Sequence, residues 1–205
     1  MIFNAEMVRA ILDGRKTQTR RVLATYQDAV KFCPEWDVNG KQIFIVLGEK
    51  DHAGMNPVIT AIPCPFGQPG DRVWVRETFR VHSRATDVAT LVYRASVRNS
   101  WTEQTHRVPV AVCNKQATPE KWTPSIHMPR WASRITLEIT GVRVERLNSI
   151  TESDAEAEGV TDTGFGDLLV DGYRYLWKSI YGEESWADNP WVWVIEFKRV
   201  KGGAA

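Results

Sequence analysis

The apolar positions at the start of the chain predict a short helix. Asn4 is a suitable N-cap before this helix, and Gly14 supplies a C-terminal stop. Residues 15–22 then read RKTQTRRV, which is polar, threonine-rich and basic, so we expect an extended segment with solvent or a ligand on at least one face. The apolar residues that recur at helical spacing in the predicted helix are Met7, Val8, Ile11 and Leu12.

Alternation of apolar and polar residues predicts strands further along the chain. Residues 71–77 alternate, with two valines on one face and Arg72, Trp74 and Arg76 on the other. Residues 134–144 alternate in the same way around a central glycine, which predicts one bent strand or two. We expect both segments to pair within a sheet.

Capping and spacing signals predict two helices and a final strand near the C-terminus. Thr151 and Asp154 form a capping signature, and Gly159 closes a helix of about two turns. Apolar residues recur at helical spacing over residues 169–180, and residues 191–200 form a strongly apolar strand. The predicted order is therefore a helix, several strands, two helices and a last strand.

The remaining segments are less regular. Residues 23–70 mix β-prone runs with turn signals, which predicts irregular hairpins. The pattern weakens over residues 80–130, where we expect a strand near residues 91–94 and a polar insertion over residues 99–122. Many short strands with few helices favour a mixed α+β fold built on a small β-barrel with flanking helices.

Composition limits the classes of protein that the chain can belong to. The 205 residues carry 26 Lys and Arg against 25 Asp and Glu, so no global charge indicates a polyanionic partner, and any affinity for nucleic acid must come from a local patch. No apolar run is long enough to span a membrane, and the three widely spaced cysteines suit a reduced compartment, so we expect a cytoplasmic protein. Nine tryptophans either fill the core, the favoured interpretation, or stack on bases.

The basic run between Gly14 and Arg21 is the most distinctive cluster. From composition alone, a solvated basic edge strand is the favoured interpretation, because runs of charge are usually solvated. The functional interpretation is that the guanidinium groups grip a phosphate or a base edge while a threonine hydroxyl takes part in chemistry. Arg72, Trp74, Arg76 and Glu77 interleave cations with an aromatic ring, which is typical of base-stacking surfaces and equally of a strand beside a barrel core.

Other common sites are not indicated. His82, His106 and His127 lack metal-ligand spacing, so we expect no metal site and no cofactor. The chain contains no GxGxxG, Walker or GxSxG motif, which argues against the common nucleotide-binding and α/β-hydrolase folds.

Four segments in this order resemble the ASCH domain family: GRKTQTRR, PGDRVWVRETF, ITESDAEAEG and the closing WVIEFK. The longer form, with SIHMPRWASR before the alternating strand, resembles members encoded by phages and prophages. The resemblance implies a PUA-like fold that meets RNA or a modified nucleoside. It also implies a single domain over residues 1–200, with insertions at about 23–62 and 84–120 and a flexible tail at 201–205.

Some small ASCH proteins are amidohydrolases that remove acetyl from N4-acetylcytidine, and the resemblance implies matching catalytic residues at Lys16, Thr19 and Glu158. Lys16 would act as base for a Thr19 nucleophile, and Glu158 would orient Lys16 or the attacking group. Residues expected to bind nucleic acid or nucleoside, by charge, stacking or hydrogen bonding, are Arg15, Arg20, Arg21, Arg72, Trp74, Arg76 and Glu77. Because Lys16 and Thr19 differ by an odd number, a regular strand would point them to opposite faces, so this mechanism needs a bend between them.

Three alternatives to the amidohydrolase remain open on the sequence. One is a non-catalytic RNA-binding module, and another is a ribonuclease of the same fold. The third, from a different class, is a phage assembly or host-interaction protein whose tryptophan-rich insertions make the contacts.

Overall fold

The structure, a computed structural model, describes residues 1–161 and 168–200. The predicted tail at 201–205 lies outside the described residues. Within them, the helices are α1 (Ala5–Leu12), α2 (Trp101–Gln104), α3 (Glu152–Ala157) and α4 (Leu169–Tyr181). The strands are β1 (Gln18–Val22), β2 (Lys31–Trp36), β3 (Gln42–Leu47), β4 (Val58–Pro63), β5 (Arg72–Trp74), β6 (Phe79–Arg84), β7 (Val88–Tyr93), β8 (Thr105–Pro109), β9 (Thr136–Arg146) and β10 (Trp191–Arg199).

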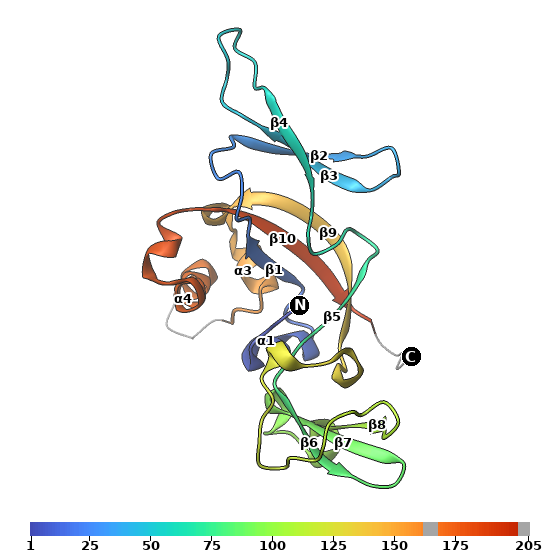
Figure 1. Cartoon of the computed structure of the whole chain (residues 1–205). Coiled ribbons are helices and arrows are strands. Elements are labelled where there is room, and N and C mark those ends of the chain that lie inside the picture. The colour runs from blue at the N-terminus through green and yellow to red at the C-terminus, as the bar shows by residue number, and fades with distance from the viewer. Residues whose placement is uncertain (162–167, 201–205) are drawn as a thin grey trace. The chain divides into compact units, whose positions relative to one another are not determined.

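The strands form three sheets, so the fold is mixed α+β as predicted. The four-stranded sheet has the order β1-β10-β9-β5 and is curled, while β2-β3-β4 and β6-β7-β8 are three-stranded antiparallel sheets (Figure 1). The predicted order of helices and strands is confirmed, with the short α2 as an addition. The strand predicted at 71–77 is shorter than expected, since only Arg72–Trp74 is a regular strand.

Two compact units make up the chain. The first unit comprises Met1–Gly14, Arg72–Leu137 and residues 199–200, and the second comprises Arg15–Asp71 and Glu138–Lys198. Each is described by itself below.

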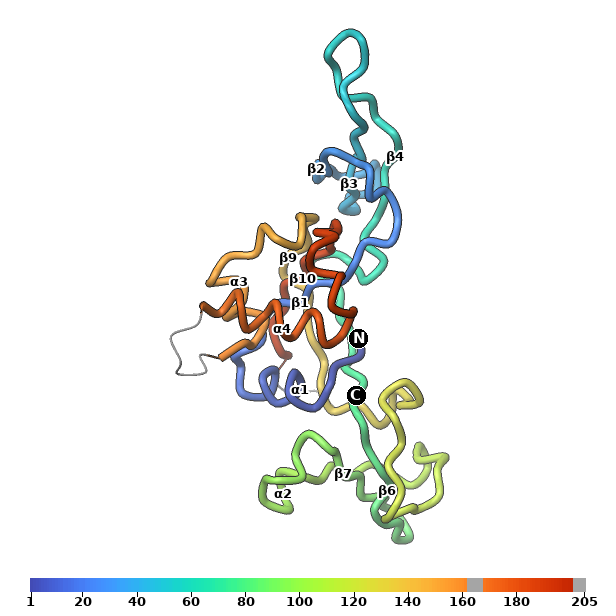
Figure 2. Tube along the Cα trace, turned by 90° about the vertical axis from the view of Figure 1, so that its left-hand side faces the viewer, coloured from blue at the N-terminus to red at the C-terminus, as the bar shows by residue number. Residues whose placement is uncertain are grey.

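In the second unit, α3 and α4 cover one face of the sheet beside β1 (Figure 2). The core between them consists of apolar side chains from both helices, β10 and the turns before α3. Burying these side chains is the main stabilising contribution of this layer. The buried members are Leu147, Ile150, Ala155, Tyr173, Trp177, Val192 and Val194.

The β2-β3-β4 sheet of the second unit is more regular than predicted. Its strands pair along their whole length, and the loop between β2 and β3 turns at Gly40, whose φ is +73°. Phe44 of β3 meets Trp193 of β10 edge-on, with 5.1 Å between ring centroids. Only alternate side chains of β3 are buried, because the sheet has one covered face.

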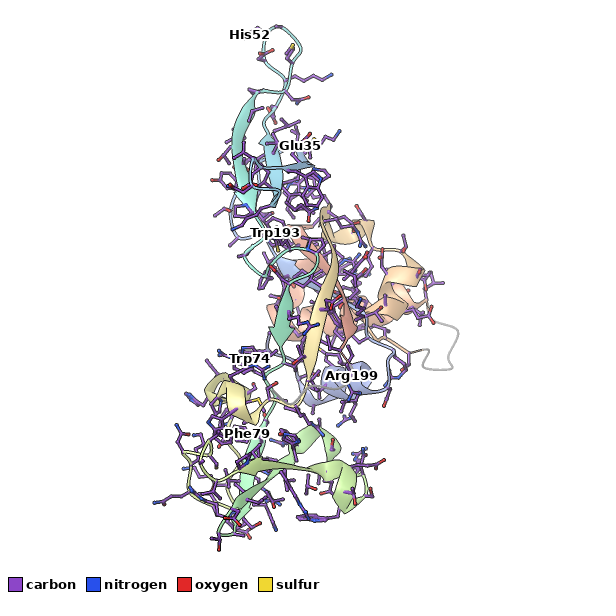
Figure 3. The ribbon with its side chains drawn as sticks, turned by 90° about the vertical axis from the view of Figure 1, so that its right-hand side faces the viewer. Glu35, His52, Trp74, Phe79, Trp193 and Arg199 are labelled. Atoms are coloured by element: carbon purple, nitrogen blue, oxygen red, sulfur yellow. The ribbon has the colours of Figure 1, made fainter. Side chains whose placement is uncertain are left out.

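The first unit has its own core around the β6-β7-β8 sheet. Phe79, at the start of β6, is fully buried in this core (Figure 3). The strand predicted near 91–94 is confirmed as β7, whereas the stretch at 99–122 predicted as a polar insertion also contains α2 and the third strand of this sheet, β8, which was not predicted. The reason is that β8 buries only Val108, so its sequence shows no apolar alternation.

Local signals of the sequence are confirmed at the two helix starts for which a cap is predicted. The Asn4 side chain accepts a hydrogen bond from the Met7 backbone at 2.8 Å, and Thr151 forms a capping box with Asp154. Residues 136–146 form one strand, β9, in which a side chain added at Gly141 would lie 2.8 Å from Glu196 Oε2.

The tryptophans are less buried than predicted. Trp177 and Trp193 lie in the core, whereas Trp36 and Trp101 are 64% and 52% exposed. Core filling therefore explains only part of the tryptophan content. Among the described residues, no helix is both long and apolar enough to cross a membrane.

Candidate active site on the first strand

The basic segment leaves the ladder of backbone hydrogen bonds just before β1, in the second unit. The Thr17 carbonyl accepts a hydrogen bond from the backbone of Phe197 at 2.8 Å, which continues the ladder with β10. The Thr17 N–H instead donates to the carbonyl of Ala157, at the end of α3, also at 2.8 Å. The chain therefore leaves the regular ladder at Thr17, which places Lys16 outside β1 and against the C-terminal end of α3.

Lys16 and Glu158 form a buried ion pair just before β1. Lys16 Nζ donates to Glu158 Oε2 at 2.6 Å and to the Glu158 backbone carbonyl at 2.9 Å. The two side chains are 0% and 2% exposed. Glu158 is the C-cap of α3, and the capping box at Thr151 together with Gly159 at φ +87° sets where this helix starts and stops. The α3 helix therefore presents one carboxylate to one amine inside the protein.

Burial changes the acid–base behaviour of Lys16. Loss of solvation lowers the pKa of Lys16 below its ordinary value, although the charge and hydrogen bond of Glu158 act in the opposite direction. The nearby charges of Arg21 and Arg20 lower this pKa further. A lysine with a lowered pKa and a defined carboxylate partner is typical of a general base, and it is also compatible with a structural ion pair.

Arg20 extends the pair into a network. Its side chain is fully buried and lies 3.5 Å from Glu158 Oε1, 3.2 Å from Asp154 Oδ2 and 3.3 Å from Glu145 Oε2. The Arg20 Nε makes no hydrogen bond with the residues that the structure describes. One donor of this guanidinium is therefore buried and unsatisfied among the described residues.

Sequence reasoning missed the acidic and basic members that complete the network. Arg143 of β9 bonds to Glu145, to Asp154 at 2.8 Å and to Glu196. A signal was present, because Asp154 and Glu158 lie four residues apart on one helix face and Arg143 and Glu145 share one face of a strand. Nothing in the sequence indicates that these two faces meet.

The interpretation of the basic run between Gly14 and Arg21 as a solvated edge strand is wrong for the residues of the run that are buried. β1 is at the edge of its sheet, but Lys16, Thr19 and Arg20 are each less than 5% exposed. Carboxylates from α3 and β9 neutralise the buried cations, which removes the need for solvent. Arg15 remains exposed, with a hydrogen bond to the Gly159 carbonyl at 3.4 Å, and Arg21 is half-buried.

Thr19 occupies a different position from Lys16. It pairs with Ile195 of β10, and strand alternation sets it on the face of β1 opposite to Arg20, which faces α3. The Thr19 hydroxyl makes no hydrogen bond within the described part of the chain. The second unit therefore brings together Lys16, Glu158 and Arg20, with Thr19 adjacent in the chain but on the other face.

The other predicted binding residues belong to the first unit. Arg72 is exposed, and the Arg76 guanidinium lies over the Trp74 ring at 4.6 Å. Glu77 is buried, and both its carboxylate oxygens accept hydrogen bonds from Arg134, at 2.9 and 3.0 Å. The Glu77 carboxylate is therefore already bound by Arg134. Solvent reaches at least part of Arg72, Trp74 and Arg76.

No His, Cys, Asp or Glu side chains gather in threes that could hold a metal ion in residues 1–161 and 168–200. The chain matches no model of a known protein family, and neither a curated protein nor a solved structure matches it.

Proposed function

We propose that the chain is a PUA-like protein that hydrolyses an N-acyl amide on a modified nucleoside, such as the acetyl group of N4-acetylcytidine. The observation that carries the proposal is the buried contact between Lys16 Nζ and Glu158 Oε2 at 2.6 Å, with the pKa of Lys16 lowered by burial. The resemblance of the GRKT segment and the later helix to ASCH hydrolases motivates the choice of substrate.

The residues support a two-step acyl transfer. Neutral Lys16 takes the proton of the Thr19 hydroxyl as Thr19 Oγ1 attacks the acetyl carbonyl. The amide C–N bond then breaks, the Lys16 ammonium returns the proton to the departing N4 of cytidine, and the acetyl group stays on Thr19. Water, deprotonated by Lys16, then attacks this ester. The C–O bond to Thr19 breaks, Lys16 returns the proton to Thr19 Oγ1, and acetate is released. Glu158 stabilises the ammonium that forms in each step.

This assignment places a geometric demand on β1. The Thr19 hydroxyl must come within hydrogen-bond reach of Lys16 or of one bridging water when substrate is bound. Lys16 and Arg20 both contact Glu158, on the face of β1 opposite to Thr19, so the backbone at Thr17, which leaves the ladder with β10, is where the chain would have to move for this approach. The assignment of Thr19 is supported by its hydroxyl, which makes no hydrogen bond with any residue that the structure describes.

A non-catalytic role is the second candidate, and one observation favours it. Both carboxylate oxygens of Glu158 are engaged by Lys16 and Arg20, which are its neighbours in the network. In this role, the network holds α3 against β1 and takes no part in turnover. Buried ion networks can have such a purely structural role.

The test measures cytidine and acetate release from N4-acetylcytidine by the full chain. Lys16→Met and Thr19→Ala should each abolish turnover, and Thr19→Ser should keep part of it because serine also carries a nucleophilic hydroxyl. Thr17→Ala is the matched control, since the Thr17 side chain is exposed and only its backbone contacts α3. Circular dichroism on each variant separates loss of chemistry from loss of folding.

Two results would overturn the proposal. Turnover retained in a folded Thr19→Ala variant would reject Thr19 as the nucleophile. Absence of turnover in the folded wild-type protein would leave the non-catalytic role of the network as the better explanation.

A further inference from the structure

Positive charge is concentrated in one segment of the first unit. Residues 72–137 contain eleven Lys and Arg against four Asp and Glu, a formal net charge of +7. The rest of the chain contains fifteen Lys and Arg against twenty-one Asp and Glu, a net charge of −6, and these two values give the overall charge of +1. Residues 72–137 are therefore strongly basic, although the net charge of the whole chain is close to zero.

Most of this positive charge is not neutralised inside the unit. Arg98 and Arg107 are exposed and form no ion pair with any residue that the structure describes. Arg80 and Arg84 bond to backbone carbonyls, those of Pro119 and Lys115. In the second unit, by contrast, the buried cations are matched by carboxylates. An uncompensated cluster of this kind attracts a polyanion.

The β6-β7-β8 sheet arranges part of this charge on one face. One side of the sheet packs on the core through Phe79, Val81 and Leu91. The strand register sets Arg80 of β6, opposite Val92, and Arg107 of β8, opposite Thr90, on the other side. We call this side the outer face.

Aromatic rings flank the cations of the outer face. The Arg80 guanidinium lies over the Trp122 ring at 4.7 Å, and the Trp101 ring meets His82 edge-on at 4.9 Å. Trp101 is 52% exposed, so much of its ring is open to a partner. A sheet face that combines guanidinium groups with an open aromatic ring suits phosphates and unpaired bases at the same time.

We propose that the outer face, defined by Arg80, His82, Arg107, Trp101 and Trp122, binds single-stranded nucleic acid. Arg80 and Arg107 contact the phosphates, and Trp101 stacks on a base. This surface lies in a different unit from Lys16, and its binding does not depend on amide hydrolysis.

Arginine content favours nucleic acid over a membrane surface. Nine of the eleven cations in residues 72–137 are Arg, whose planar fork binds phosphate with two hydrogen bonds and stacks on rings. The open Trp101 ring favours single strands over duplexes, because the bases of a duplex are already stacked on one another.

The test titrates the full chain into short fluorescent oligonucleotides and follows anisotropy between about 50 and about 200 mM salt. The probes are single-stranded RNA, single-stranded DNA of the same sequence and the RNA duplex. We expect both single strands to bind more tightly than the duplex, with an affinity that falls as salt rises. The comparison of RNA with DNA shows whether the 2′-hydroxyl is recognised.

Variants locate the binding on the outer face. Arg107→Glu should weaken binding and lower the slope of log affinity against log salt by about 1. Trp101→Ala should weaken binding by about tenfold, with the salt slope unchanged, because stacking is not ionic. Lys50→Glu, at an exposed cation of the second unit, is the control with the same change in charge, and it should bind as the wild type does.

Three results would overturn the proposal. One is that neither single strand binds at the lowest salt. Another is that Arg107→Glu and Trp101→Ala bind as tightly as Lys50→Glu. The third is that anionic vesicles bind the protein while oligonucleotides do not, which would assign the charge to a membrane surface. Hydrolysis of N4-acetylcytidine is measured separately, so failure of either proposal leaves the other standing.

Discussion

Glu158 accepts hydrogen bonds from Lys16 through its side chain, at 2.6 Å, and through its backbone carbonyl, at 2.9 Å, although 142 residues separate the two in the chain. One residue therefore ends α3 and neutralises the amine that precedes β1. Glu158 also contacts Arg20, so replacing Glu158 and replacing Lys16 should lower the stability of the protein by different amounts.

Glu158→Gln should destabilise the protein more than Lys16→Met. The first change leaves Lys16 and Arg20 without their shared carboxylate, whereas the second leaves Glu158 beside Arg20 at 3.5 Å. Breaking a buried pair costs about 3–5 kcal/mol, and we expect Glu158→Gln in that range at neutral pH. Urea unfolding gives the free energies. Equal losses in the two variants would contradict a shared role of Glu158 toward both cations.

Stability should rise with pH on the alkaline side. Burial lowers the pKa of Lys16 in the folded protein, while an unfolded Lys keeps a pKa of about 10.4. Between these two values the unfolded chain binds a proton that the folded chain does not, so the free energy of unfolding increases with pH. Urea unfolding at a series of pH values should show this slope in the wild type, and Lys16→Met should flatten it.

The pH dependence of turnover tests the role of Glu158 as a positioning residue. If neutral Lys16 is the base, kcat/KM should rise with pH through the lowered pKa of Lys16. Glu158 raises that pKa, so Glu158→Gln should move the rise to lower pH. A structural role alone would reduce the rate without moving the profile.

Thr151→Ala should weaken the attachment of α3. The Thr151 hydroxyl donates to Asp154 Oδ2 at 2.9 Å and accepts from the Asp154 backbone at 3.1 Å. Loss of this cap should cost about 1 kcal/mol in thermal or urea unfolding. Thr151→Ser, which keeps the hydroxyl, should restore most of the stability. If both variants unfold alike, the hydroxyl is not the stabilising group.

Gly67→Ala should cost more than Gly54→Ala, although both glycines have positive φ. A Cβ at Gly67 would lie 2.9 Å from both Asp71 Oδ2 and Ile139 Cδ1, whereas nothing lies within 4 Å at Gly54. We expect a loss of about 1 kcal/mol at Gly54 from the left-handed backbone and about 3 kcal/mol at Gly67. Similar losses at both positions would show that the loop around Gly67 relaxes.

The sequence alone determined the elements whose signals are local. The cap at Asn4, the capping box at Thr151 and the helical spacing of residues 169–180 each act within a few residues, so they could be predicted. The β8 strand could not be predicted, because only its Val108 is buried and its pairing with β7 is not visible in the local sequence.

The tertiary structure decided the environment of the charges. From the sequence alone, a run of cations is interpreted as exposed to solvent. The carboxylates that pair with Lys16 and Arg20 come from the end of α3 and from β9, more than a hundred residues away. In the same way, the overall charge of +1 conceals the basic segment at 72–137 until the chain is divided into its units. Charge acts through space, and only the folded chain brings together residues that are distant in sequence.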